Sequence, residues 1–204
     1  QALQDEVKLF MSVDYQAAPQ HRWQQQEELL HSVANPAHPS DIVGEVQYAS
    51  EEQVEEAMQI AGRAFVDWNS RSVEERADVL DSLADVLEAN YAELIALLIR
   101  EAGKVVVDAI DEVREAVDFC RYYAMQARRL MPSQSLQGYT GESDTLSLSG
   151  RGVFVCVSPW NFPVAIFVGQ VVAALVTGNT VVAKPAEQTS LLAAKVVEYC
   201  YHAG

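Results

Sequence analysis

The stretch between residues 152 and 189 constrains the fold more than any other part of this chain. Residues 153–157 form a short, continuous apolar run of β-branched and aromatic side chains, which is typical of a strand covered on both faces. The following segment, about 163–177, is apolar nearly all round and therefore predicts a buried helix. Pro163 can occupy its first position, and Gly178 can adopt the left-handed conformation that ends it. A second strand over 180–183 completes a βαβ unit, whose strands are almost always parallel.

Polar residues follow each of these two strands. Because parallel strands end at the same edge of a sheet, Asn161 and Lys184 are expected to face one crevice. A cation at Lys184 and a carboxylate at Glu187 would suit ribose hydroxyls. The usual glycine fingerprint is absent, since Gly150 and Gly152 precede their strand and no third glycine has the required spacing. Taken alone, Asn161 could equally be a polar residue near a helix start, and Lys184 a solvated lysine at a strand end.

The remaining segments predict an α/β fold with a helical layer. Residues 1–28 are polar without a sustained period and are interpreted as a linker or a poorly ordered lead-in. A hairpin is expected from 30–33 with 42–48. Capping boxes at Ser50 and Ser72 predict two helices, the second running unbroken to Gly103, and a third helix spans about 104–131. Alternation over 145–149 predicts a half-exposed strand, and 190–202 a last helix.

The third helix carries an apolar stripe and a crowded acidic face. The stripe, expected to face the core, consists of Val106, Ile110, Val113, Val117, Cys120 and Met125. Charged residues between them, namely Glu112, Arg114, Glu115 and Asp118, are interpreted as a solvated face with local ion pairs.

Composition excludes several classes of function. Acidic residues outnumber basic ones 29 to 14, so a nucleic acid or an anionic membrane is an unexpected partner. The longest apolar stretch, residues 164–176, is too short to span a bilayer, and the first residues lack the pattern of a leader, so a cytoplasmic protein is expected. The four histidines are scattered, so no metal site is expected. Cys120, Cys156 and Cys200 lie in apolar or aromatic surroundings and are expected to be inert.

Two paired motifs carry a resemblance to a known family. Ser158-Pro-Trp-Asn-Phe-Pro163, followed by Gly178-Asn-Thr-Val-Val-Ala-Lys-Pro-Ala-Glu-Gln-Thr189, resembles the aldehyde dehydrogenase superfamily, whose cofactor domain lacks the glycine fingerprint. Glu101-Ala-Gly-Lys104 and the segment 111–124 narrow the resemblance to the glutamate-semialdehyde (pyrroline-5-carboxylate) dehydrogenase part of bifunctional proline utilization A proteins. The resemblance runs from about residue 33 to residue 204.

This resemblance implies a chemistry and a set of site residues. In the family a cysteine thiolate attacks the aldehyde, hydride passes to NAD, and a glutamate activates water to release the acid. Asn161 matches the amide that stabilises the oxyanion, and Lys184 and Glu187 match contacts to the adenosine ribose. The walls of the cofactor crevice would be Ser158, Pro159 and Trp160. The matching cysteine and glutamate would lie beyond residue 204.

The resemblance also implies a larger context. Residues 1–28 would join an upstream proline dehydrogenase domain that carries FAD, and 29–204 would be part of the NAD-binding domain. A hairpin over 137–151 would contribute to a homo-oligomer contact. Glu115 could line the tunnel by which the small aldehyde substrate enters.

Two functions from different classes remain open at this point. The first is a fragment of an NAD-dependent dehydrogenase that oxidises glutamate γ-semialdehyde to glutamate, inactive without its cysteine. The second is a stand-alone, non-catalytic helical module for association or regulation. The first is favoured because a two-stranded sheet with an apolar edge is marginal by itself.

Overall fold

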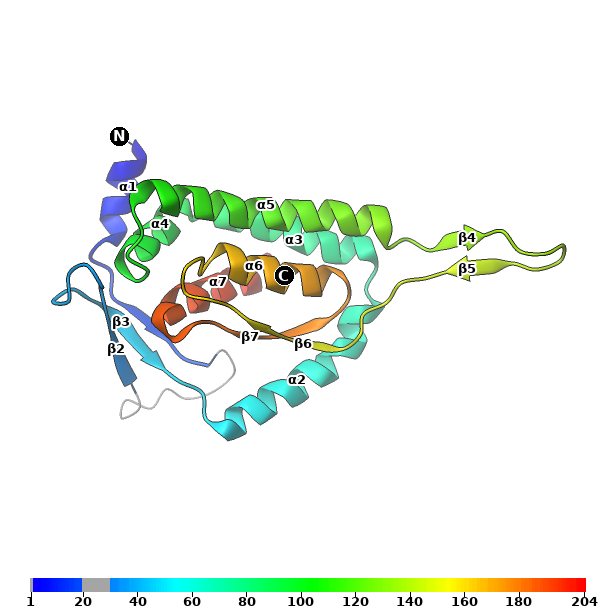
Figure 1. Cartoon of the computed structure of the whole chain (residues 1–204), viewed down its shortest axis with the longest axis horizontal. Coiled ribbons are helices and arrows are strands. Elements are labelled where there is room, and N and C mark those ends of the chain that lie inside the picture. The colour runs from blue at the N-terminus through cyan, green and yellow to red at the C-terminus, as the bar shows by residue number, and fades with distance from the viewer. Residues whose placement is uncertain (1, 20–29) are drawn as a thin grey trace.

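The computed structural model describes residues 2–19 and 30–204 (Figure 1). Its helices and strands are α1 (Ala2–Phe10), β1 (Tyr15–Ala17), β2 (Leu30–Ala34), β3 (Ile42–Gln47), α2 (Glu51–Ser70), α3 (Val73–Ala89), α4 (Tyr91–Arg100), α5 (Val106–Leu130), β4 (Gln134–Leu136), β5 (Asp144–Leu146), β6 (Val153–Val157), α6 (Ala165–Val176), β7 (Thr180–Lys184), the short 3-10 helix η2 (Glu187–Thr189) and α7 (Ser190–Ala203).

The expected βαβ unit is confirmed. Strands β6 and β7 pair in parallel, with Val153 opposite Thr180 and Val157 opposite Lys184. Helix α6 connects them and is buried along most of its length. It ends as predicted at Gly178, whose φ of 87° is left-handed, while the N–H groups of Gly178 and Asn179 donate to carbonyls in the last turn. The helix begins at Ala165, two residues later than predicted, because Pro163 and Val164 form a turn.

Strand β6 is less covered than the sequence predicted. Phe154, Val155 and Val157 are 43%, 55% and 60% exposed, so the expectation that both faces would be covered was wrong among the described residues. Helix α6 lies over one face of the two-stranded sheet and α2 over the other (Figure 1), but α2 packs mainly against β7. An apolar run therefore indicated the strand correctly without indicating what covers it.

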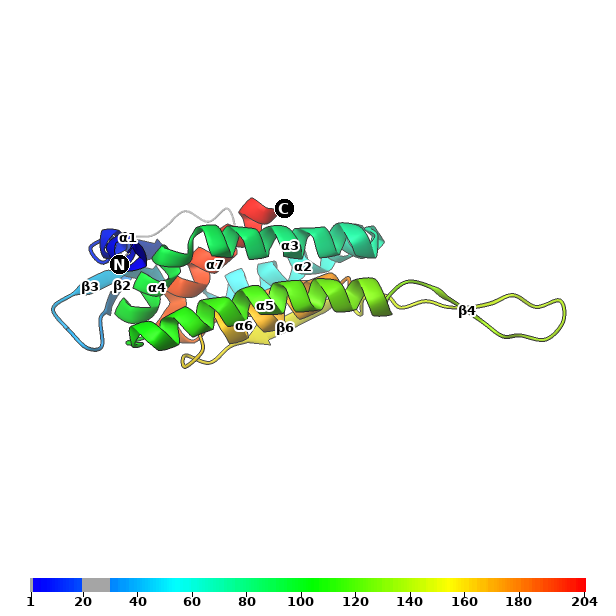
Figure 2. The ribbon, with the colours of Figure 1, turned by 90° about the horizontal axis from the view of Figure 1, so that it is seen from above.

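A layer of helices lies beyond α6. Helices α3 and α5 run side by side (Figure 2) and make the most extensive contact between two elements of the fold. Both predicted capping boxes are present, at Ser50 for α2 and at Ser72 for α3. The unbroken second helix was a wrong expectation, because the chain turns at Asn90 and continues as α4. The Asn90 amide donates to the Val86 carbonyl, the local side-chain bond by which asparagine competes with a continuing helix.

The buried face of α5 differs from the predicted stripe. Val113, Val117 and Cys120 are buried as expected, whereas Val106 and Met125 are about half exposed. The rest of this face consists largely of alanines, namely Ala109, Ala116, Ala124 and Ala127. Because α5 packs against both α3 and α6, small side chains allow close approach of the helices on two sides. The positions of the large apolar residues therefore predicted the buried face of α5 poorly.

The N-terminal segment has regular structure in α1 and β1, so the expectation of poor order was wrong there, while its role as a linker stays a prediction. Helix α1 packs against α4, and β1 pairs in parallel with β3 in a sheet of order β1, β3, β2. Tyr15 and Ala17 are buried, so this short strand belongs to the core. The predicted β2–β3 hairpin is confirmed. Residues 1 and 20–28 of the expected linker lie outside the described residues.

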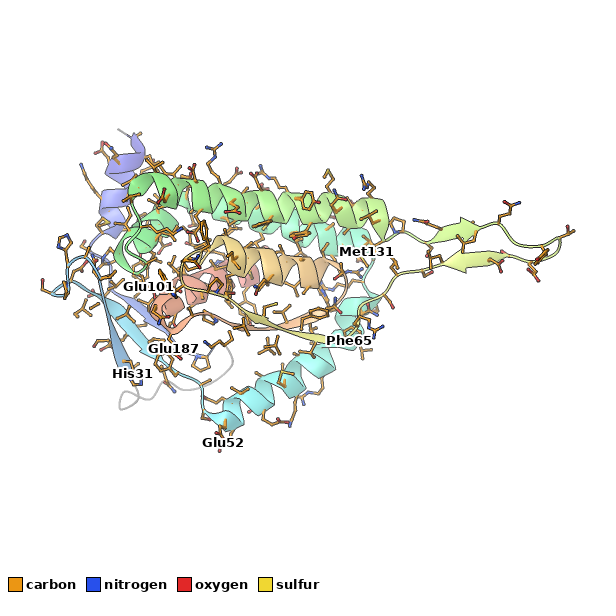
Figure 3. The ribbon with its side chains drawn as sticks, viewed as in Figure 1. His31, Glu52, Phe65, Glu101, Met131 and Glu187 are labelled. Carbon is orange, nitrogen blue, oxygen red and sulfur yellow. The ribbon has the colours of Figure 1, made fainter. Side chains whose placement is uncertain are left out.

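A hairpin of β4 and β5 extends away from the body (Figures 1 and 2). It leaves from the end of α5, near Met131 (Figure 3). The predicted strand over 145–149 is confirmed only at 145 and 146, since β5 ends at Leu146. Both strands are exposed throughout. Among the described helices, none is long and apolar enough to cross a membrane.

Candidate functional site

The C-terminal edge of the β6–β7 sheet brings the predicted site residues together. Val157 and Lys184 are register partners, and the Ser158 N–H donates to the Lys184 carbonyl at 3.1 Å. The loop after β6 carries Pro159, Trp160 and Asn161. All three side chains are exposed, as are those of Lys184 and, just beyond it, Glu187. In the described chain this edge is therefore an open surface, accessible to a ligand.

Ser158 is the one buried member of the set. It is 5% exposed, and its Oγ has no hydrogen-bond partner among the described residues. A buried hydroxyl without a partner is costly, so such atoms call for an explanation, for example an absent ligand or water. The Ser158 hydroxyl is enclosed by protein, whereas the exposed ammonium of Lys184 and the exposed carboxylate of Glu187 at the same edge could hold a polar ligand rich in hydroxyl groups, such as the ribose of NAD.

A buried carboxylate on α5 holds the far end of the same loop. The Oε1 atom of Glu112 accepts the N–H of Val164 at 2.7 Å and that of Ala165 at 3.3 Å, at the start of α6. Its Oε2 atom pairs with the Lys104 ammonium, which also lies 4.0 Å from the centroid of the Phe162 ring. The sequence interpretation of Glu112 as solvated was wrong, since the residue is 1% exposed.

A second buried carboxylate holds the helix that follows β7. The two oxygens of Glu101 accept the N–H groups of Leu191 and Leu192, both at 2.8 Å, in the first turn of α7. Burial raises the pKa of this carboxyl to about 8, although the two N–H donors act in the opposite direction. Glu101 and Glu187 lie toward the same end of the molecule (Figure 3). The motif 101–104 contained the signal for this contact, but its structural role was not inferred.

The other charged residues of α5 behave as expected. Arg114, Glu115 and Asp118 are exposed, and Arg114 lies 3.9 Å from Asp111 in a surface ion pair. An entrance role for Glu115 stays a prediction.

The three thiols are poor nucleophiles. Burial raises the pKa of Cys120 to about 12 and that of Cys200 to about 12, and it also raises the pKa of Cys156. A catalytic thiol requires the opposite shift. Within residues 2–19 and 30–204, no group of three or more histidine, cysteine or acidic side chains could hold a metal ion.

These features define an α/β protein of the open parallel-sheet class, with exposed polar residues at the carboxyl ends of its parallel strands. The chain belongs to the aldehyde dehydrogenase family, whose model matches residues 23–204. The family resemblance drawn from the motifs is thereby confirmed.

Individual relatives narrow the comparison. The chain is 47% identical over 172 residues to the bifunctional protein PutA of Salmonella typhimurium, a match that covers 84% of this chain and 12% of the relative. It is 43% identical over 170 residues to 1-pyrroline-5-carboxylate dehydrogenase of Anoxybacillus flavithermus, covering 83% of this chain and 33% of the relative. The chain thus spans a third or less of the length of these curated relatives.

Solved structures agree in fold. A 1-pyrroline-5-carboxylate dehydrogenase from Thermus with bound NAD has a TM-score of 0.93 at 34% identity, covering all of this chain and 40% of that one. Proline utilization A from Bdellovibrio bacteriovorus, inactivated by N-propargylglycine, has a TM-score of 0.89 at 37% identity, covering all of this chain and 21% of that one.

Proposed function

We propose that this chain supplies the NAD-binding edge and the oxyanion-binding amide of a dehydrogenase that oxidises glutamate γ-semialdehyde to glutamate. The observation that carries the proposal is the parallel pairing of β6 and β7, which brings the 158–161 loop to the same edge as Lys184. Relatives named 1-pyrroline-5-carboxylate dehydrogenase, one of them solved with bound NAD, support the substrate and the cofactor.

Each residue has a role in this proposal. The Lys184 ammonium and the Glu187 carboxylate hydrogen-bond the adenosine ribose, and Ser158, Pro159 and Trp160 form the wall against which the cofactor lies. NAD, when bound, supplies the hydride acceptor. The Asn161 side-chain amide donates to the aldehyde oxygen as negative charge develops on it, and this interaction is stronger in the transition state than in the ground state.

The nucleophile is proposed to come from residues outside this chain. The raised pKa of all three thiols supports this, because attack on an aldehyde requires a lowered one. The chain by itself is therefore expected to form no NADH from glutamate semialdehyde and to bind NAD weakly. An FAD-dependent proline dehydrogenase domain in the same protein and a location in the cytoplasm stay predictions.

Substitution of Asn161 tests the proposal in a dehydrogenase that contains this chain. Asn161→Ala should lower kcat by about 10²–10³, the usual effect of removing one oxyanion donor, with little change in the Kd of NAD. Asn161→Asp should be at least as harmful, since a carboxylate cannot donate and repels the developing charge. If Asn161→Ala instead left kcat intact and lowered stability by about 1 kcal/mol, Asn161 would be a helix-capping residue.

A further inference from the structure

We propose that Glu112 and Lys104 are positioning residues, which fix the Asn161 loop to α5 and thereby set where the oxyanion-binding amide stands. This inference rests on the proposed function for its catalytic consequence, but the fixing of the loop is independent of it. Neither residue is within the 158–161 loop, and both act through its far end.

The carboxylate supplies the first half of the attachment. The first N–H groups of a helix lack partners within the helix, and they carry the positive end of its dipole. Glu112 satisfies two of them, at Val164 and Ala165, with one oxygen. A buried carboxylate is costly unless it is paired and hydrogen-bonded, and here the Lys104 ammonium pairs with the second oxygen. The start of α6 is thus bound to α5 by a charge that has no competing solvent.

The ammonium supplies the second half. Gly103, with φ of 68°, and a bond from the Lys104 N–H to the Leu98 carbonyl end the α4 segment and turn the chain toward α5. The Lys104 side chain is only 12% exposed, and its Nζ lies 4.0 Å from the Phe162 ring centroid, within range of a cation–π contact. Phe162 directly follows Asn161. At its other end the loop is tied by the Ser158 N–H to β7, so both ends are held.

Helix α5, which carries Glu112, is closely packed against α6. A Cβ at Gly169 would lie 3.1 Å from the Phe119 ring, so α5 and α6 are closely packed at this point. The far end of α6 is also fixed, because Trp68 Nε1 donates to the Leu175 carbonyl at 2.8 Å and Arg76 Nε donates to the Val176 carbonyl at 3.0 Å. Loss of the Glu112 contacts would therefore release the loop locally and leave the helix in place.

The charges of the pair allow a rescue test. In Glu112→Gln the amide N–H₂ would face the Lys104 ammonium, donor against donor, and this repulsion moves the amide oxygen away from the Val164 N–H. In Lys104→Met the carboxylate loses its counter-charge, while a thioether can still pack against Phe162. The double variant removes both conflicts, so its defect should be smaller than that of either single variant, a coupling that a double-mutant cycle measures.

The experiment uses the full-length dehydrogenase that contains this chain, with Ser72→Ala as the control. Ser72 caps α3 through its bonds to Glu75, three residues on, so its loss removes a local helix cap and none of the contacts of the loop. Each variant is measured for kcat, for the Kd of NAD, and for amide exchange of a peptide covering 158–168. Misplacement of a reacting group can reduce rates by about 10²-fold.

We expect Glu112→Gln and Lys104→Met each to lower kcat by about 10 to 10²-fold, with the Kd of NAD changed less than about 3-fold. Exchange at Val164 and Ala165 should rise at least 10-fold, and the double variant should recover most of both losses. Ser72→Ala should leave kcat and the exchange of this peptide unchanged.

Two results would overturn the inference: unchanged exchange at Val164 and Ala165 in both single variants, or a double variant whose defects are the sum of the single ones. A failure of the proposed function looks different. If Asn161→Ala left kcat intact while Glu112→Gln still loosened the 158–168 peptide, the attachment would stand and the role of Asn161 would be wrong.

Discussion

Two buried glutamates, Glu101 and Glu112, perform the same task at neighbouring places. Each accepts the first N–H groups of a helix that follows a parallel strand, α7 after β7 and α6 after β6. They differ in what offsets their negative charge. Glu112 has the Lys104 ammonium beside it, whereas the partners of Glu101 among the described residues are the backbone N–H groups of Leu191 and Leu192. Such donors satisfy hydrogen bonds without supplying a full opposite charge.

Because Glu101 lacks such a counter-charge among the described residues, we expect the free energy of unfolding to depend on pH. Burial raises the pKa of Glu101 from 4.5 to about 8 in the folded protein, so the folded state keeps a proton that the unfolded chain releases near pH 4.5. Its contribution to stability is complete below about pH 4.5 and is lost as pH rises toward 8. We expect the free energy of unfolding to fall over this interval by at most about 1.4 kcal/mol per pH unit.

Denaturant titrations at several pH values, with Glu101→Gln as the comparison, check this expectation. The glutamine variant should lack the part of the slope between pH 5 and 8 that Glu101 contributes. Equal slopes in the two proteins would contradict it.

Sequence reasoning predicted the βαβ order that brings the loops after β6 and β7 to one edge, but it misread what supports those loops. The roles of Asn161, Lys184 and Glu187 at that edge stay predictions. Glu112 was misread because it lies among exposed charged residues of α5 and looks like them. Its burial depends on the start of α6, which lies 52 residues later, and no local pattern reports such a contact.

At the scale of elements, the termination of α6 is the most demanding local geometry. Gly178 has a φ of 87°, and a Cβ there would lie 2.6 Å from Asn69 Oδ1, the atom that accepts the Gly150 N–H. Gly178→Ala should therefore destabilise the protein by about 1–2 kcal/mol from the left-handed conformation alone, and by more if Asn69 must move.

The matched control is Gly62→Ala. Gly62 lies on the exposed side of α2, and a Cβ there meets nothing within 4 Å. The same substitution should stabilise the protein by about 0.5–1 kcal/mol at this position, because alanine favours a helix. Thermal or denaturant unfolding of both variants measures the two effects, and the same sign at the two sites would be inconsistent with this account.

Elements were predictable where a local rule decides them. The capping boxes of α2 and α3, the βαβ order and the β2–β3 hairpin follow from residues close together in the chain. The break at Asn90 was missed because the apolar period continues across it into α4. The exposure of β6 was predicted wrongly because an apolar run indicates a strand but does not show whether another element packs against each of its faces.

At the scale of the whole molecule, the exposed β4–β5 hairpin is the feature that most favours binding of one copy of the protein to another. Leu136, Leu146 and Leu148 are about half exposed, and Tyr139 is 83% exposed. Apolar side chains on an exposed strand pair favour pairing with another chain. We therefore expect the protein to self-associate through this hairpin, in line with the homo-oligomer expected from the family.

Leu136→Ser combined with Leu146→Ser should raise the dissociation constant at least 10-fold in equilibrium sedimentation. The free energy of unfolding should change by no more than about 0.5 kcal/mol, because surface substitutions rarely do more. A monomeric unsubstituted protein across a wide concentration range would count against this role.

The segment 2–17 shows what composition cannot reveal at this scale. Its apolar residues show no sustained period, yet Tyr15 and Ala17 are buried and β1 adds to the sheet of β2 and β3. Three residues are too few for an alternating pattern, and the pairing depends on β3, far along the chain. Gly44 of β3 permits it, since a Cβ there would lie 2.1 Å from the Tyr15 carbonyl oxygen.

The attachment of α6 and α7 to Glu112 and Glu101 also has a consequence for the order of events during synthesis. The partners of Glu101 are 90 residues downstream and those of Glu112 are 52 downstream. At about 5–20 residues per second, the two carboxylates wait on the order of 3 to 18 seconds for the helices that will cover them. During that interval both are hydrated, and the apolar faces of α3 and α5 lack α6 and α7. The first half of the chain thus exposes apolar surface to solvent while the second half is being made.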